Sequence, residues 1–415
     1  MKTEIINVGT ELLMGSVVNT NAAYLAKKCT ELGFGIYYQT VVGDNEGRLC
    51  EAIQTAKSRA DILILTGGLG PTEDDMTKEA VAKVFQKRLV EDETVKKEIQ
   101  AFFSRKHKDS VPSNNWKQSL IIEDSFVLHN ENGTAPGMIL EQDNNIVILL
   151  PGPPNELIPM FEQKVSQYLS SKQSSVFVTK MVKLCGIGES AVAQEIHDLI
   201  LKQSNPTIAT YAKPGEVHIR VTGKGKDADE AKEVVKPIVK ELKKRFGDSI
   251  YTTDEQVSLE ECVVKLLNKH ELTVVTAESC TGGMIAATIV NVPGASNVLK
   301  QSFVTYSNKA KRKYLDVSKN TLKKYTEYSE QCAKEMAQGA ALVHDSDVSI
   351  AVTGLAGPGG GTPEKPVGLV YIACYVKEKV FVKEFHFRGT REMIREYSVV
   401  NGLDLLRRCL LECYQ

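Results

Sequence analysis

The stretch that decides the fold of the first part of the chain is Asp61-Ile-Leu-Ile-Leu-Thr-Gly-Gly-Leu-Gly-Pro-Thr-Glu-Asp-Asp75. A short aliphatic run, typical of a strand, ends in a glycine-rich turn that opens a helix. Upstream of this stretch, strand-like runs at 4–9 and 35–42 alternate with amphipathic segments at 20–32 and 46–58. Strands and helices that alternate at this spacing predict βαβ units with parallel strands, so the expected fold class is α/β.

Two joints in the composition divide the chain. The run Pro151-Gly-Pro-Pro154 follows a strand-like stretch at 145–150, and the helix-compatible segment after it ends in polar residues 170–175. The second joint, 247–254, is polar and follows a strongly charged helical pattern. Joints of this kind are common at domain boundaries. We therefore predict three domains, at residues 1–168, 172–250 and 255–415.

The middle domain is predicted to be a small α/β module of βαββα order, similar to KH-like modules. Its expected elements are a strand at 176–184, a helix at 188–201, a hairpin of strands 207–211 and 217–222, and a helix at 227–246. The last domain begins with a helix at 257–269 and a strand at 272–276, and it continues as another α/β unit. Likeness of fold alone assigns no function.

Composition excludes several classes of protein. The chain has 415 residues, 51 Lys and Arg against 52 Asp and Glu, and a net charge of −1. A protein that coats DNA or an anionic membrane needs an excess of clustered positive charge, so we expect neither role. Its aliphatic runs are far shorter than a membrane span, and its first residues have no basic segment followed by an apolar core, so we expect neither a membrane span nor a signal peptide. The nine cysteines include no CxxC pair, which favours a reduced, cytoplasmic protein.

The glycine turn is the first candidate site. Gly67, Gly68 and Gly70 let the backbone approach a ligand, and the helix after the turn presents N–H groups that suit phosphate. Glu73, Asp74 and Asp75 add negative charge there, which makes sense if a divalent cation sits between carboxylates and phosphates. The alternative is a plain strand-to-helix turn whose acidic residues are favoured by the helix dipole. The motif is neither a Walker A loop nor a dinucleotide fingerprint.

A serine at a helix start is the second candidate site. The strand-like run 272–277 leads into Glu278-Ser-Cys-Thr-Gly-Gly283, so Ser279 is expected on a strand-to-helix turn. Helix N–H groups near 281–283 are then placed to stabilise an oxyanion. The alternative is that Ser279 or Thr281 only caps the helix, and Cys280 is a competing nucleophile.

A serine nucleophile needs a base. No Gly-x-Ser-x-Gly elbow is present, and the histidines at 270, 344 and 386 form no pattern. The segment 303–312 is expected to be a strand carrying Thr305 and Tyr306, followed by a turn that presents Lys309 and Lys311. A lysine removed from water loses its proton more readily and can act as the base. The alternative is an ordinary solvated helix face.

Five segments in order resemble the N-terminal domain of the CinA family. They are Gly9-Thr-Glu-Leu-Leu-Met-Gly15, Asn19-Thr-Asn21, Val41-Val-Gly-Asp-Asn45, the glycine turn, and Pro151-Gly-Pro-Pro-Asn-Glu-Leu157. That domain is similar to the molybdopterin-binding fold of molybdenum-cofactor biosynthesis proteins, a three-layer fold. In the family it is associated with metal-dependent ADP-ribose pyrophosphatase activity.

The resemblance implies roles for residues of this first domain. Gly67, Gly68 and Gly70 would lie near the phosphates, and Asp74 or Asp75 near a divalent metal such as Mg, Mn or Co. Thr10 and Asn19 are expected to contact the nucleotide.

The last domain resembles the CinA C-terminal domain, the nicotinamide-nucleotide amidase family. The matching segments are Thr276-Ala-Glu-Ser-Cys-Thr-Gly-Gly283, Pro293-Gly-Ala-Ser296, Phe303-Val-Thr-Tyr-Ser-Asn308 with Lys311, Thr353-Gly-Leu-Ala-Gly-Pro358, and Gly361-Thr-Pro-Glu-Lys-Pro-Val-Gly-Leu-Val370. The family hydrolyses the carboxamide of nicotinamide mononucleotide to nicotinic acid mononucleotide and ammonia. No cofactor is expected at this site.

By the same resemblance, Ser279 would be the nucleophile, Lys311 the base, Ser296 a proton relay, and Tyr306 part of the pocket. The expected substrate-binding residues of this domain are Thr281, Gly282, Gly283, Thr305, Gly354, Gly357, Arg391 and Arg395. The two arginines rest on our own argument: they lie four apart at the start of the last helix, which suits a clamp on the 5′-phosphate. Their alternative role is a pair of exposed helix charges.

The expectation is thus a bifunctional enzyme of pyridine-nucleotide recycling, acting on nicotinamide mononucleotide and ADP-ribose. The resemblance also implies a homodimer. Two alternatives remain: the first domain only binds a nucleotide or pterin, or the protein is an accessory factor in competence or recombination. The near-neutral charge makes nucleic acid an unfavoured partner.

Overall fold

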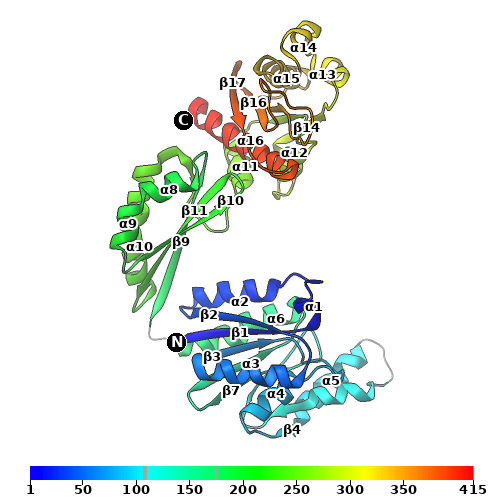
Figure 1. Cartoon of the computed structure of the whole chain (residues 1–415), viewed down its shortest axis with the longest axis vertical. Coiled ribbons are helices and arrows are strands. Elements are labelled where there is room, and N and C mark those ends of the chain that lie inside the picture. Colours follow the sequence, from blue (N-terminus) through cyan, green and yellow to red (C-terminus); the bar gives the residue numbers. More distant parts are fainter. Residues whose placement is uncertain (106–109, 173–174, 415) are drawn as a thin grey trace. The chain divides into compact units, whose positions relative to one another are not determined.

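The structure, a computed structural model, describes residues 1–105, 110–172 and 175–414. It confirms the α/β fold class, since every sheet in both parts of the chain is packed with helices (Figure 1). The packing separates two compact units, residues 1–177 with 225–231 and residues 178–224 with 232–415. The boundary expected between the middle and last domains therefore stays a prediction. No helix of the described residues is both long and apolar enough to traverse a bilayer.

The first unit is built on a six-stranded sheet of order β2-β1-β3-β8-β7-β6. Strands β1, β2, β3 and β8 run parallel, as the alternating pattern predicted, and β7 and β6 continue the sheet antiparallel. Their bounds are β1 Lys2–Val8, β2 Gly35–Val42, β3 Ile62–Thr66, β6 Phe126–Leu128, β7 Gly137–Gln142 and β8 Asn145–Leu150. A separate pair, β4 Leu89–Glu91 and β5 Leu120–Ile122, is antiparallel.

Helices cover both faces of this sheet, which gives the expected three layers (Figure 1). In β3, Ile62 and Ile64 pack on one side with α2, while Leu63 and Leu65 pack on the other with α3. This alternation is what a strand buried on both faces produces. The helices are α1 Thr10–Leu13, α2 Thr20–Glu31, α3 Glu46–Arg59, α4 Thr77–Val84, α5 Glu93–Arg105, α6 Pro154–Met160 and α7 Ser166–Ser171. Between α6 and α7 the turn widens to a π-helix at Phe161–Val165, and a 3₁₀-helix spans Ser113–Ser119.

The middle segment forms a four-stranded sheet of order β10-β11-β9-β12. The strands are β9 Val176–Cys185, β10 Thr207–Lys213, β11 Glu216–Gly225 and β12 Ile250–Thr252, and the helices are α8 Glu189–Glu195, α9 His197–Lys202 and α10 Ala228–Phe246. Two expectations need correction. The single helix predicted at 188–201 is two helices that break at Ile196, and the joint at 247–254 contains a 3₁₀-turn and the fourth strand. β12 was missed because its three residues pair only with β9, which is distant in sequence.

The last segment has a five-stranded sheet of order β14-β13-β15-β16-β17. Strands β14, β13 and β15 are parallel, and β16 and β17 follow antiparallel. The strands are β13 Val274–Glu278, β14 Leu299–Val304, β15 Val348–Gly354, β16 Leu369–Val376 and β17 Lys379–His386. The helices are α11 Leu259–Lys269, α12 Met284–Val290, α13 Asn308–Leu315, α14 Lys319–Tyr325, α15 Glu330–Val343 and α16 Arg391–Tyr414, and a 3₁₀-turn spans Ala295–Asn297.

Two hydrophobic layers hold this sheet. Helices α11, α12 and α16 pack on the face that carries Ile350 and Ile372, and α13 and α15 on the face that carries Ala351 and Ala373. Ser258 caps α11 through a capping box: its hydroxyl accepts a hydrogen bond from the Glu261 amide, and the Glu261 carboxylate accepts one from the Ser258 amide. This local signal fixes the start of the helix. The strand predicted to carry Thr305 and Tyr306 ends at Val304, so both residues lie in the loop beyond it.

Candidate active sites

The ends of three parallel strands build the site in the last segment. Ser279 follows β13 directly, Thr305 follows β14, and Gly354 is the last residue of β15. The register pairs Glu278 with Val304 on one side and with Val352 on the other. The carboxyl ends of neighbouring parallel strands meet at one edge of a sheet, where α/β folds bind ligands. The topology thus brings together three segments that are distant in sequence.

Ser279 and Lys311 are in direct contact at this edge. Lys311 Nζ lies 2.9 Å from Ser279 Oγ and donates a hydrogen bond to the Thr305 carbonyl at 2.8 Å. The two side chains are buried, with 5% of Ser279 and 1% of Lys311 exposed. Burial lowers the pKa of the Lys311 ammonium, because the charged form loses its hydration, although the nearby Cys332 and Glu327 act in the opposite direction. The lysine is therefore not the solvated helix charge that its neighbours suggested.

Local structure fixes the lysine. Ser307 caps α13 by accepting a hydrogen bond from the Ala310 amide, and Lys311 falls on the buried side of the first turn. Lys309, also considered as the base, stays exposed. The backbone of Ser279 is held in place by its amide, which donates a hydrogen bond to the Val352 carbonyl of β15.

Two of the helix N–H groups expected to hold an oxyanion, those of Gly282 and Gly283, are already occupied. Glu278, fully buried, accepts hydrogen bonds from the amides of Gly283, Ile285 and Ala286. The Gly282 amide donates back to the Ser279 carbonyl. A buried carboxylate is tolerated where several donors satisfy it, and here the donors are the start of α12. The expectation that Gly282 and Gly283 supply the oxyanion donors is therefore wrong.

Gly282 and Gly283 have a different task. Their φ angles are 63° and 95°, in the left-handed region that glycine adopts most readily. They turn the chain from the serine into the helix. The hydroxyls of Thr281 and Thr305 are buried beside them and have no hydrogen-bond partner within the described residues. Buried polar atoms of this kind are normally satisfied by water or a ligand.

The two arginines proposed as a clamp on the phosphate make different contacts in the structure. Arg391 lines the cavity and donates to the Gly357 carbonyl and the Tyr306 hydroxyl, at 2.6 and 2.9 Å. Arg395 instead donates to the carbonyls of Cys280 and Thr281, at 3.0 and 2.9 Å. Since Arg395 is bound to the loop that carries Ser279, its side chain holds that loop in place.

The cavity in front of Ser279 has a volume of about 340 Å³. The lining includes Ser279, Tyr306, Lys311, Gly354, Gly357 and Arg391, which the sequence analysis named, and Asn308, Glu327 and Tyr328, which it missed. No motif marks 327 or 328; the fold brings them in through the loop between α14 and α15. Ser296, the expected relay, is exposed in its 3₁₀-turn and is not among the lining residues.

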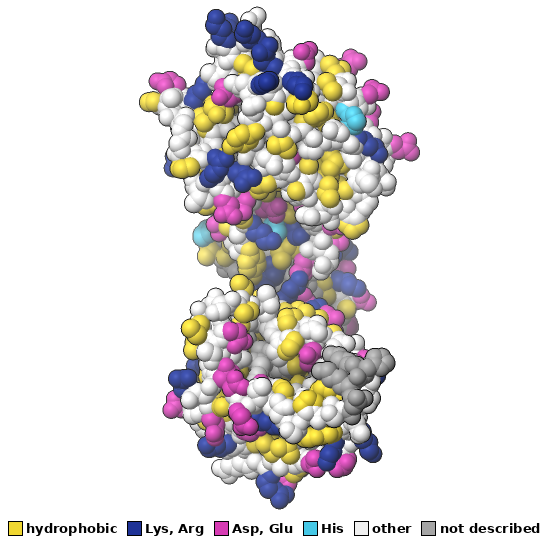
Figure 2. All heavy atoms as spheres, turned by 90° about the vertical axis from the view of Figure 1, so that its right-hand side faces the viewer, with side chains coloured by type: hydrophobic (Ala, Val, Ile, Leu, Met, Phe, Trp, Pro, Cys, Tyr) yellow, Lys and Arg dark blue, Asp and Glu magenta, His cyan; other side chains and the backbone are white. Residues whose placement is uncertain are grey.

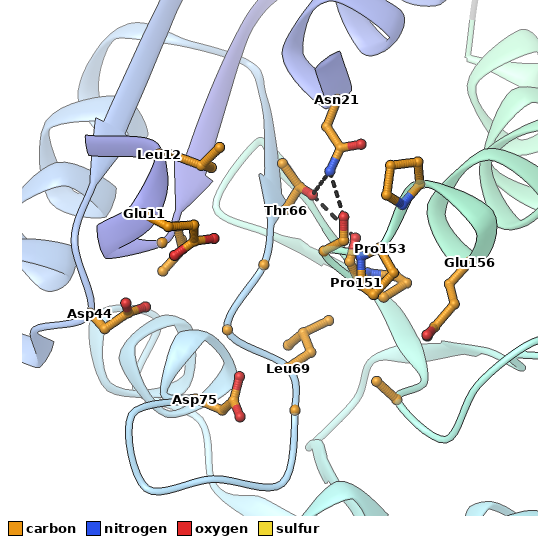
Figure 3. Close-up of a pocket in the computed structure, with 18 of the residues that line it drawn as sticks. Glu11, Leu12, Asn21, Asp44, Thr66, Leu69, Asp75, Pro151, Pro153 and Glu156 are labelled. Atoms are coloured by element: carbon orange, nitrogen blue, oxygen red, sulfur yellow. Dashed lines mark hydrogen bonds between the residues drawn. The ribbon is translucent and has the colours of Figure 1, made fainter. Parts of the chain in front are cut away.

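The first unit has a larger cavity, of about 590 Å³, at the carboxyl ends of β1, β3 and β8 (Figure 3). The glycine turn forms one wall. A Cβ on Gly67 would lie 2.2 Å from the Val8 carbonyl, and one on Gly70 would lie 2.4 Å from Asp75 Oδ2. Only glycine fits at 67, where φ is 96° and the clash would be with backbone. Asn21 closes the opposite wall by donating to the Gly152 carbonyl at 2.6 Å.

Five carboxylates line this cavity: Glu11, Asp44, Asp74, Asp75 and Glu156. Figure 2 shows a hollow on the first unit with acidic side chains beside it. Figure 3 shows Glu11 and Asp44 on one side of the glycine turn and Glu156 on the other. Of the five, only Asp74 and Asp75 were predicted from the sequence, since Glu11, Asp44 and Glu156 come from separate elements.

The carboxylates do not form a closed metal cage. Within the described residues, no group of three Asp, Glu, His or Cys side chains is arranged to hold an ion. Asp44 Oδ2 accepts from the amide and the hydroxyl of Thr10, and Asp75 Oδ2 accepts from the Thr72 amide. In both residues these bonds use Oδ2, which leaves Oδ1 as a possible metal ligand. One or two carboxylates, together with phosphate oxygens of the substrate, are a common ligand set for a hard divalent cation. The donor set fits a metal that arrives with its substrate.

Thr10 and Asn19 do different things. Thr10 is not among the lining residues and positions Asp44. Asn19 lines the cavity, where its side chain caps α2 by accepting from the Ala22 amide.

Comparison with known proteins places the whole chain. Three family models match in order: "probable molybdopterin binding domain" at residues 4–171, "damage-inducible protein CinA KH domain" at 179–252 and "CinA C-terminal domain" at 256–410. A putative competence-damage inducible protein of Clostridium beijerinckii is 52% identical over 99% of this chain and all of its own length. A CinA-like protein of Dictyoglomus turgidum is 50% identical with the same coverage.

Among solved structures, a competence/damage inducible protein from Agrobacterium tumefaciens is 40% identical; the match covers 37% of this chain and 93% of that one, with a TM-score of 0.36. Full-length identity to the curated relatives decides the assignment. The chain belongs to the CinA family of competence/damage-inducible proteins.

Proposed function

We propose that the last segment hydrolyses the carboxamide of nicotinamide mononucleotide to nicotinic acid mononucleotide and ammonia. The observation that carries the proposal is the buried contact of 2.9 Å between Lys311 Nζ and Ser279 Oγ. A neutral amine has two N–H bonds and a lone pair. With one N–H bonded to the Thr305 carbonyl, the lone pair is free to accept the serine proton.

The reaction then proceeds in two steps. Ser279 Oγ attacks the carboxamide carbon as its proton passes to Lys311, and the tetrahedral oxyanion forms. The amides of Cys280 and Thr281, at the turn after the nucleophile, are the donors proposed for this oxyanion. As the C–N bond breaks, Lys311 returns the proton to the leaving nitrogen and ammonia departs. A water molecule, deprotonated by Lys311, cleaves the acyl-enzyme to the acid and restores the Ser279 hydroxyl.

The test is product analysis after incubation of the full chain with nicotinamide mononucleotide, with and without chelator. We expect equal amounts of ammonia and nicotinic acid mononucleotide, unaffected by the chelator. Production of the acid by the Ser279→Ala protein at the wild-type rate contradicts the assignment of the nucleophile. The direct contact makes a relay through Ser296 unnecessary, so Ser296→Ala should retain most of the activity.

For the first unit we propose cleavage of the diphosphate of ADP-ribose with a divalent metal, Mg, Mn or Co. The support is the glycine turn and the five carboxylates around one cavity. The glycine backbone would bind the phosphates, and Asp74 or Asp75 would hold the ion against them, with phosphate oxygens completing its ligands. When bound, the ion would neutralise phosphate charge and activate water. Turnover of ADP-ribose, measured against added metal and chelator, tests this.

A second candidate for the first unit is binding without turnover. The matching family model describes a molybdopterin-binding domain, and a pterin phosphate would suit the same glycine turn. Binding of ADP-ribose or a pterin with no product formed would favour this reading. A role in competence or recombination, as the names of the relatives suggest, would require binding of single-stranded nucleic acid in a salt-dependent gel shift. A cytoplasmic homodimer remains part of the proposal.

A further inference from the structure

One carboxylate in the cavity before Ser279 has no part in the mechanism above. Glu327 lies in the loop between α14 and α15, and among the described residues that line this cavity it is the one Asp or Glu. Its carboxylate accepts a hydrogen bond from Asn308 Nδ2 at 3.3 Å. Because Asn308 also lines the cavity, the carboxylate lies at the cavity wall.

The loop that carries Glu327 is held firmly. Thr353 Oγ1 donates to the Glu327 carbonyl at 2.7 Å. Lys365 reaches over from the glycine-rich loop and donates to the carbonyls of Tyr325 and Tyr328, at 2.6 and 3.1 Å. The Lys365 ammonium is therefore bound to backbone oxygens on either side of Glu327. Within the described part of the chain, no Lys, Arg or His forms an ion pair with this carboxylate.

The cavity consequently has charges of opposite sign. Arg391 lies at the wall formed with Gly357 and Tyr306, and Glu327 at the wall formed with Asn308. A ligand that carries both an anionic phosphate and a cationic ring matches this arrangement. A half-buried carboxylate with no cationic partner also attracts a positive charge more strongly than one in water, because the effective dielectric constant is lower.

We propose that Glu327 selects ligands whose carboxamide-bearing ring is positively charged, that is, N-alkylated pyridinium carboxamides, over the same ring in a neutral form. The inference rests on the proposed amidase function and adds a specificity-determining residue to it. A cationic ring next to Glu327 also faces Lys311, and a neighbouring positive charge disfavours the ammonium form of the lysine. The charge that Glu327 recognises would therefore also help to keep the base neutral.

The test compares nicotinamide mononucleotide with its 1,4-dihydro form, which has the same carboxamide, ribose and phosphate but a neutral ring. Affinities are measured by calorimetry on the full-length Ser279→Ala protein, so that the different reactivity of the two rings does not enter. We expect the oxidised nucleotide to bind at least about tenfold more tightly. In Ser279→Ala/Glu327→Gln the preference should fall to about twofold or less.

Two further variants separate charge from shape. Glu327→Asp keeps the charge and should keep a preference for the cationic ring, even if both ligands bind more weakly. Glu330→Gln removes an exposed carboxylate that does not line the cavity, and it should leave the preference unchanged. Each protein is checked for an unchanged thermal unfolding midpoint.

The outcomes distinguish this inference from the amidase proposal. Equal affinity for the two ligands, no binding of either, or a preference that survives Glu327→Gln overturns the role of Glu327, whatever the wild-type protein hydrolyses. A preference that depends on Glu327, together with no turnover by the wild-type chain, supports charge recognition and refutes the amidase.

Discussion

The two cavities of this chain differ in how complete they are without a ligand. In the last segment, the proposed nucleophile and base already touch, and both are buried. In the first unit the carboxylates surround an open cavity, and within the described residues they build no closed metal site. The difference follows from the chemistry proposed for each. Amide hydrolysis needs a serine and a base that the protein must supply, whereas diphosphate cleavage uses a metal that the substrate phosphates help to hold.

The independence of the two sites is tested most strongly by a change at Ser279. We expect Ser279→Ala to lower kcat for nicotinamide mononucleotide by on the order of 10⁴-fold or more, because no other group replaces the attacking oxygen. Turnover of ADP-ribose should be unchanged, since this side chain contacts only the second site. Both activities are measured on one preparation. A parallel loss of both would mean that the variant is misfolded or that the two sites are not separate.

The reciprocal change is made at Asp75. Asp75→Asn keeps the size of the side chain but removes the charge, so we expect ADP-ribose turnover to fall by about 10²- to 10³-fold. Chelator should have the same effect on the wild type, and neither should alter ammonia release from nicotinamide mononucleotide. Glu73→Gln is the matched control, because Glu73 is exposed and does not line the cavity. Full activity of Asp75→Asn would exclude this carboxylate as a metal ligand.

A smaller effect is expected at Arg395, which positions the serine loop through two carbonyls. Arg395→Ala should lower kcat by about 10- to 100-fold and change KM little, because small displacements of reacting groups are costly. Added guanidinium should restore part of the rate, which a general loss of stability would not allow. Arg388→Ala, at an exposed arginine before the same helix, serves as the control. If KM alone rises, Arg395 binds substrate as first expected.

The smallest effect concerns pH. Only neutral Lys311 can accept the proton, so kcat/KM should rise as the pH increases through the pKa of this lysine. Glu327 favours the ammonium form and raises that pKa, in opposition to burial. Glu327→Gln should therefore move the acid limb of the profile to lower pH, by up to about one unit. The pH profile of ADP-ribose turnover should not move. A shift to higher pH would mean that another group controls the limb.

Particular residues show which features of the sites could be predicted from the sequence. Ser279 at a strand-to-helix turn and the glycine turn at 67–70 were predicted from local pattern, and both turns are where they were expected. Lys311 was singled out with its alternative still open, and only the resemblance raised it above its charged neighbours. The donors of α12 were misassigned, because nothing local indicates that Glu278 turns back to cap the helix that follows it.

The sequence by itself determined the alternation of strands and helices at the start of the chain and the positions of the glycine turns. These depend on side-chain periodicity and backbone freedom, which act over a few residues. The tertiary structure alone decided which of two arginines faces the cavity and that Glu327 and Asn308 share its wall. It also decided that Glu11, Asp44 and Glu156 meet the carboxylates of the glycine turn in the first unit. Such contacts depend on how strands far apart in sequence align in a sheet, and on which side chains that alignment removes from water.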